Sequence, residues 1–244
     1  MENRIRHQKD VCTRPGSGMI LSPLVMSEIP TALGTFSASL EGTGAAQAAV
    51  ERIAFTLAYV DSGDSITLSQ CPAQRQEAIE LAQSFGMSVS SQPPEDGFTW
   101  DGQVLSGNME PSVIIHDVAH WQVCAPERRH VPDFGLGAGP ETGLKAQADQ
   151  WMSVHGIQRE MEEAMASLLG ILWEVELGHP AILAFLEQNW LEGGASLHNR
   201  QHFLKVFNHL QHYGLLDTTG RPTKIVRTAP DTEFLDIFIT PNGS

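Results

Sequence analysis

The chain has 244 residues, of which 41% are apolar and 18% charged, as is usual for a soluble globular protein with a hydrophobic core. Its formal net charge of −14 disfavours nucleic-acid binding, because affinity for phosphate backbones comes from Lys and Arg. No apolar run is long enough to cross a bilayer, and the polar N-terminus has no signal peptide, so we expect no membrane partner. Three widely spaced cysteines exclude a disulfide framework and favour a reducing, cytoplasmic location.

The expected elements run from a loose N-terminus into a mainly helical chain. Residues 1–40 mix proline and glycine with short apolar runs and are expected to be loosely structured. Apolar spacing, with proline or glycine at several ends, predicts helices at 43–60, 74–85, 113–124, 158–177, 181–190 and 197–213. Short strands are expected at 65–69 and 87–91, and the glycine- and proline-rich residues 131–143 are expected to form a loop.

These elements predict an α+β fold that is predominantly helical, with a small N-terminal αβ layer. A Pro/Asp/Gly stretch at 92–97 suggests a boundary. We therefore expect an N-terminal extension with the αβ layer at 1–97, a helical domain at 98–217 and an irregular C-terminal tail at 218–244.

The segment IIHDVAHW, residues 114–121, carries the strongest chemical signal. His116 and His120 are four residues apart, so on a helix both imidazoles project from one face, one turn apart, and can bind the same cation. The alternative is a pair of helix histidines without a metal. The apolar surroundings favour the metal, because buried ring nitrogens need partners. A mononuclear site between helices then needs a carboxylate from elsewhere.

Candidates for that third ligand lie in the predicted helix 158–177. Glu160 and Glu163 share one face, whereas Glu162 points elsewhere. Ser167 and Gly170 follow Glu163 on a face of small residues, which would permit close packing against a second helix. At least two of the three acids are expected to be solvated residues near the helix start.

Two other features of the motif have more than one interpretation. Asp117 occupies the place of the general-base glutamate in HExxH metalloproteases, and it either takes a catalytic role or forms a local hydrogen bond. Its shorter side chain counts against peptide hydrolysis. Arg128 and Arg129 lie near Asp133, so they either form an ion pair that holds the glycine loop or bind a substrate carboxylate.

The stretch HDVAHWQVCAPERRHVPDFGLG resembles the signature of the elongation factor P hydroxylase family, which reads HExxHW, a pair of arginines, then DFG. That family also has a glutamate about fifteen residues before a Gly-x-Pro, the place that Glu163 occupies here before Gly178 and Pro180. The resemblance covers roughly residues 105–185. Asp117 replaces the family's glutamate, and residues 1–100 show little similarity to it.

The resemblance implies a non-haem iron centre with His116, His120 and Glu163 as ligands. Glu160 stays the alternative acid, because it shares a helix face with Glu163. It implies a monooxygenase-type hydroxylase that uses Fe(II) and O2 on a lysine-type side chain of a translation factor, or on a related substrate. Zinc or another divalent metal suits the same ligands. Two other functions stay open: an HD-type phosphohydrolase, suggested by the His116–Asp117 pair, and a metal-binding module without catalysis.

Overall fold

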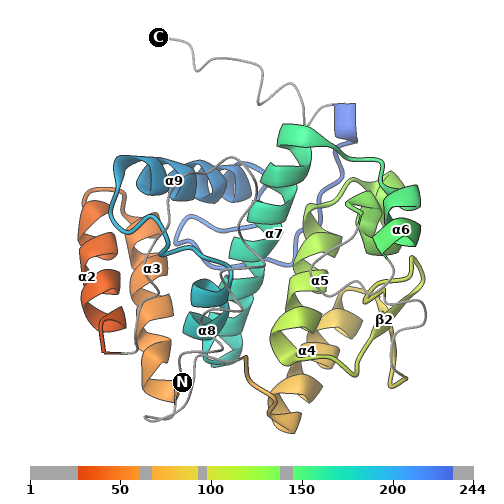
Figure 1. Cartoon of the computed structure of the whole chain (residues 1–244), viewed down its shortest axis with the longest axis horizontal. Coiled ribbons are helices and arrows are strands. Elements are labelled where there is room, and N and C mark those ends of the chain that lie inside the picture. Colours follow the sequence, from red (N-terminus) through yellow and green to blue (C-terminus); the bar gives the residue numbers. More distant parts are fainter. Residues whose placement is uncertain (1–26, 61–67, 93–97, 138–144, 233–244) are drawn as a thin grey trace.

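The computed structural model describes residues 27–60, 68–92, 98–137 and 145–232 (Figure 1). Its helices are α2 Ile29–Ser39, α3 Ala45–Phe55, α4 Pro72–Ser84, α5 Pro111–Val123, α6 Lys145–Ala148, α7 Gly156–Leu177, α8 Ala181–Glu187 and α9 Leu197–His212. Two short parallel strands, β1 Ser88–Ser90 and β2 Val104–Ser106, form the sheet. The prediction of a mainly helical α+β fold is therefore confirmed.

One prediction about the N-terminal region is wrong. Within the residues expected to be loose, α2 is a regular helix whose Ile29, Leu33 and Phe36 are buried. These residues are spaced four and three apart, which places them on one helix face. Pro30 lies in the first turn, where a missing backbone N–H costs little. The expected strand at 65–69 falls mostly outside the described residues, and β2 was not predicted.

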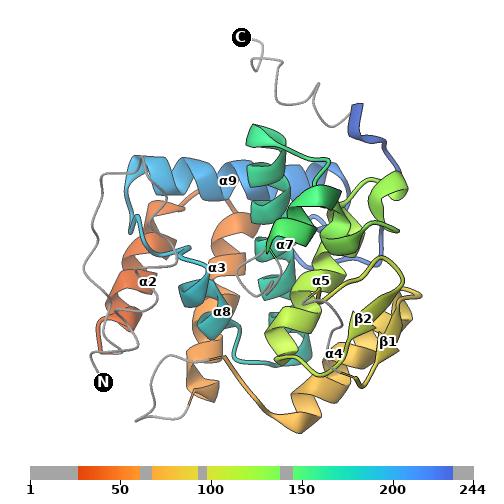
Figure 2. The ribbon, with the colours of Figure 1, turned by 45° about the vertical axis from the view of Figure 1, so that its right-hand side comes forward.

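Helix α7 is the centre of the molecule, with helices on both sides (Figure 1). Helices α2, α3, α8 and α9 lie on one side, and α4, α5, α6 and the two strands lie on the other (Figure 2). A single buried cluster takes residues from α2, α3 and α4 as well as from α5, α7 and α9. Residues of the predicted extension 1–97 and of the predicted helical domain 98–217 thus share one core. The division of the chain into these domains stays a prediction.

Local signals explain where the two central helices begin and end. Pro111 lies in the first turn of α5, and Cys124 is extended after the last turn. Helix α7 ends at Gly178, whose φ of 73° is the left-handed conformation that closes many helices. The long α7 packs most extensively against α5, which bears the two histidines.

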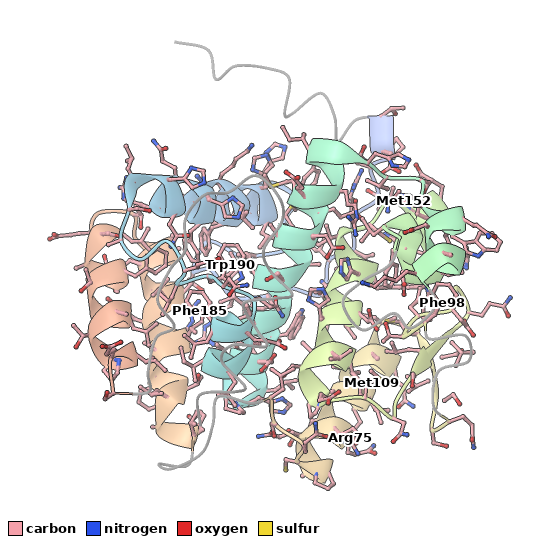
Figure 3. All side chains as sticks on the ribbon, in the orientation of Figure 1. Arg75, Phe98, Met109, Met152, Phe185 and Trp190 are labelled. Carbon is pink, nitrogen blue, oxygen red and sulfur yellow. The ribbon has the colours of Figure 1, made fainter. Side chains whose placement is uncertain are left out.

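Contacts between side chains attach the outer helices to this centre. Phe185 and Trp190 stack with ring centroids 6.2 Å apart in the left half of Figure 3. The indole of Trp190 donates a hydrogen bond of 2.7 Å to the Ser167 hydroxyl on α7. On the other side, Arg75 of α4 donates to the Met109 carbonyl at 2.8 Å, just before α5 begins (Figure 3). The frame that holds α5 against α7 is therefore built from both halves of the fold.

A buried acid lies at the far end of the α5–α7 contact. The side chain of Glu174 is 2% exposed. Burial, and secondarily the negative charge of Glu187, raise the pKa of Glu174 to about 8, although a hydrogen bond with Ser112 opposes this shift. At neutral pH, Glu174 is therefore mainly protonated in the folded chain.

This acid makes the free energy of unfolding depend on pH. Because its folded pKa is raised from 4.5 to about 8, its contribution is fully present below pH 4.5 and is lost as the pH rises toward 8. We expect Glu174→Gln to come close to the parent at pH 4.5 and to exceed it by about 4 kcal/mol at pH 8. Urea unfolding at both pH values measures the difference. Glu192→Gln, an exposed acid, is the control, and a parent-to-variant difference that does not change with pH would contradict the assignment.

Candidate metal centre

Helix α5 brings His116 and His120 together as their spacing predicts. Their Nε2 atoms are 2.9 Å apart, and the ring planes meet at 79°. Both Nδ1 atoms are buried and have no hydrogen-bond partner among the described residues, so each imidazole presents Nε2 to the shared space. The side chain of His116 is 26% exposed and that of His120 is 6% exposed. The pair is thus open to solvent on the His116 side.

Helix α7 supplies the acid. The Oε2 atom of Glu163 lies 3.5 Å from Nε2 of His120 and 3.9 Å from Nε2 of His116. Two turns further along α7, Gly170 packs directly against α5, since a Cβ there would lie 3.4 Å from the Cα of His116, an ordinary van der Waals distance. Of the two small residues predicted on this face, Gly170 lies against α5, whereas Ser167 accepts a hydrogen bond from the indole of Trp190.

These distances suit a single divalent ion. Ligand atoms about 2.1 Å from one ion, at angles of about 90° to 110°, lie roughly 3.0 to 3.4 Å apart. The measured separations of 2.9, 3.5 and 3.9 Å are close to that range, and all candidate ligand atoms of the three residues lie within 4.8 Å of one another. Two imidazoles and one carboxylate are a donor set that iron and zinc both accept.

The three groups also shift one another's pKa values. Burial, followed by the charge of His120, lowers the pKa of His116 to about 3. Burial acts against the charged form of His120 too, but the Glu163 carboxylate outweighs it and raises the pKa of His120. Burial alone would raise the pKa of Glu163, yet its hydrogen bond to His120 and the nearby charges lower it to about 2. A neutral imidazole and an ionised carboxylate are the forms that bind metals.

Aromatic stacking holds the ring of His120. The ring of Phe134 stacks on it with centroids 5.5 Å apart, and Trp100 in turn stacks on Phe134 at 5.8 Å. Phe134 and Asp133 have φ values of 55° and 44°, which are unfavourable for residues with a Cβ and cost on the order of 1–2 kcal/mol each. The surrounding contacts must therefore enforce the loop that positions Phe134.

Arg128 provides one of those contacts. The guanidinium is 4% exposed and donates to the Phe134 carbonyl at 2.5 Å and to Glu162 Oε2 at 2.5 Å. It therefore contacts the glycine loop through a backbone carbonyl. The ion pair with Asp133 and the binding of a substrate carboxylate both stay predictions.

Glu162 corrects another expectation. It was expected to be a solvated acid, yet it is 0% exposed and lies in the second turn of α7. Burial raises its pKa, and the Arg128 guanidinium opposes that shift. No local sequence pattern indicates this pair, because the partner lies 34 residues away. Glu160, the alternative ligand, is exposed and is not part of the His116, His120 and Glu163 group.

The remaining predicted residues lie around this group. Arg129 donates to the Trp121 carbonyl at 3.1 Å and to the carbonyl of Arg227. Asp133 donates its backbone N–H to the Trp100 carbonyl. Asp117 is 6% exposed, and its charge contributes to the raised pKa of His120, so a catalytic role stays a prediction.

The segment predicted to be an irregular tail contributes residues that the sequence did not reveal. Residues 218–230 form no helix, but Arg227 is 2% exposed and Asp231 pairs with Arg128 at 2.6 Å. These contacts span about a hundred residues of sequence, and no local pattern announces them.

Comparisons with protein-family models, curated proteins and solved structures gave no match. In the part of the chain that the structure describes, no helix combines the length and apolar character that spanning a membrane requires.

The buried ion pair of Arg128 yields a prediction about stability. Arg128→Met removes the only cation within hydrogen-bond distance of the buried Glu162 carboxylate among the described residues and leaves it with Arg227 at 3.9 Å, so we expect the free energy of unfolding to fall by about 3 kcal/mol. Denaturant unfolding measures this change. The control is Arg221→Met, because Arg221 is 52% exposed where it pairs with Glu176, and its loss should cost less than about 1 kcal/mol. Equal effects of the two variants would contradict the analysis.

Proposed function

We propose that this chain is a non-haem iron hydroxylase resembling the elongation factor P hydroxylase family. It binds one Fe(II) through His116, His120 and Glu163 and acts on a lysine-type side chain of a protein, such as a translation factor, or on a related substrate. The observation that carries the proposal is the convergence of two Nε2 atoms and one carboxylate oxygen from two helices. The resemblance of residues 105–185 to the family signature supports the same activity.

The donor set suits O2 chemistry. Fe(II) held by two imidazoles and one carboxylate keeps open positions for O2 and substrate. The overall reaction converts a C–H bond and O2 into C–OH and water, with a pair of electrons and two protons from an external reductant. Zinc is the commonest competing ion, because imidazole accepts both metals.

The residues around the site make one side of it open to solvent and the other side closed, as such a reaction needs. Glu163 and His116 are 36% and 26% exposed, so substrate and O2 can approach from their side. His120 lies against Phe134 and, beyond it, Trp100, which exclude water from the opposite side. Gly170 packs against the backbone of His116, so α5 and α7 are in direct contact at the level of this ligand.

The first prediction concerns metal binding. Protein prepared without chelator and reconstituted anaerobically should bind about one equivalent of Fe(II), or of Co(II) as a probe, per chain. Glu163→Ala and His120→Ala should weaken this binding by more than about 100-fold, because each removes a direct ligand. Glu160→Ala, three residues away on the exposed helix surface, is the matched control and should bind like the parent. Parent protein that binds no metal, or loss of binding in the control, would refute the proposed centre.

The second prediction concerns the reaction. Fe(II)-loaded protein with a reductant and a translation factor bearing a modified lysine should consume O2 and add one oxygen atom to that protein, as seen by mass spectrometry. Glu163→Ala should abolish both signals and Glu160→Ala should keep them. Metal-dependent phosphatase activity that survives His120→Ala would instead favour an HD-type phosphohydrolase. Metal binding without either activity would favour a binding module.

A further inference from the structure

The C-terminal segment reaches the candidate metal centre through Arg128. After α9 the chain crosses toward the beginning of α7, where its described part ends (Figure 2). The side chain of Asp231, near that end, accepts hydrogen bonds from Nε of Arg128 at 2.6 Å and from Nη2 at 3.0 Å. This is a two-point contact between a carboxylate and a guanidinium, which fixes orientation as well as distance.

The other donors of Arg128 point at the two elements that carry the ligands. Its Nη1 atom donates to the carbonyl of Phe134, whose ring stacks on His120. Its Nη2 atom donates to Glu162, which precedes Glu163 on α7. A guanidinium is planar and rigid, so a rotation that disturbs one of these bonds disturbs the other.

The segment that delivers Asp231 is itself held firmly. The side-chain amide of Gln122 donates to the carbonyls of Thr223 and Ile225 at 2.9 and 2.7 Å, and its oxygen accepts from the Trp173 indole. The backbone N–H of Arg227 donates to the Gln122 carbonyl at 2.9 Å. Gln122 follows His120 by two residues, so the helix turn that carries the ligand also anchors the C-terminal segment.

Asp231 is in turn fixed from two further directions. The side chain of Gln158, in the first turn of α7, donates to its Oδ1 atom at 3.1 Å. The backbone N–H of Asp231 donates to Glu127 at 3.1 Å. The carboxylate is 27% exposed, so it closes the outer side of a buried network that also includes Arg128 and Glu162.

We propose that Asp231 is a positioning residue of the metal centre. By fixing the plane of the Arg128 guanidinium, it holds Phe134 against His120 and keeps α7 in place at Glu163. This inference rests on the proposed metal centre, and it assigns to the C-terminal segment the control of that centre's geometry.

The experiment compares Asp231→Asn with the parent, with Co(II) as the probe. The amide of Asn would turn an NH2 group toward an N–H of Arg128, so the two-point contact is lost while the size is kept. We expect Co(II) affinity to fall by about 10- to 100-fold, with a changed visible Co(II) spectrum, at a temperature where far-UV circular dichroism shows an intact helical fold. Asp217→Asn is the matched control, because it makes the same change in the same segment, where Asp217 bonds to Thr219 and Arg221.

The outcomes separate this inference from the proposed function. If the parent binds no Co(II), the proposed function and the positioning role of Asp231 both fail. If the parent binds and Asp231→Asn has the parent's affinity and spectrum, Asp231 is only structural and this inference fails alone. Should Asp231→Asn not fold, Gln158→Ala decides: it removes one contact to Asp231 and is expected to weaken Co(II) binding measurably, by about 3- to 10-fold, with a shifted spectrum. Parent-like binding by that variant would overturn the proposal.

Discussion

The close antiparallel contact of α5 with α7 is the constraint on which the candidate metal centre depends. The two helices run in opposite directions, so three contacts follow one another along them: Ser112 with Glu174, His116 with Gly170, and His120 with Glu163. A Cβ at Gly170 would lie 3.4 Å from the Cα of His116, an ordinary van der Waals distance, so the two helices pack directly against each other at this level.

A largely buried network of charged side chains lies next to the contact of α5 with α7. Two arginines, Arg128 and Arg227, face the carboxylates of Glu162 and Asp231 inside the protein. A buried network of this kind adds little net stability compared with apolar packing, because each ion loses its hydration. Its value lies in orientation, since each charged group accepts only a few arrangements of its neighbours. The strained turn at Phe134 is one arrangement that the network enforces.

The proposed function relies on the unequal surroundings of the three candidate ligands. One side of the centre is open at His116 and Glu163, and the other is closed by stacked aromatic rings behind His120. A ligand set with open positions and a partly dry environment is suited to binding a small oxidant beside a substrate. The neutral state that burial favours for His116 suits it for metal binding as well.

The sequence by itself determined the parts that depend on local spacing. Four-residue separation placed His116 and His120 on one face, and proline and glycine marked the ends of α5 and α7. The choice of Glu163 over Glu160 was indicated by the resemblance, and the structure brings Glu163 to the histidines.

Only the tertiary structure decided which acids are buried and which distant groups meet them. Helical periodicity gives the direction in which a side chain leaves the helix axis, but it does not say which other part of the chain packs against that side chain. The burial of Glu162 and the contact of Asp231 with Arg128 follow from how the chain returns across about a hundred residues, and no local physical signal in the sequence carries that information.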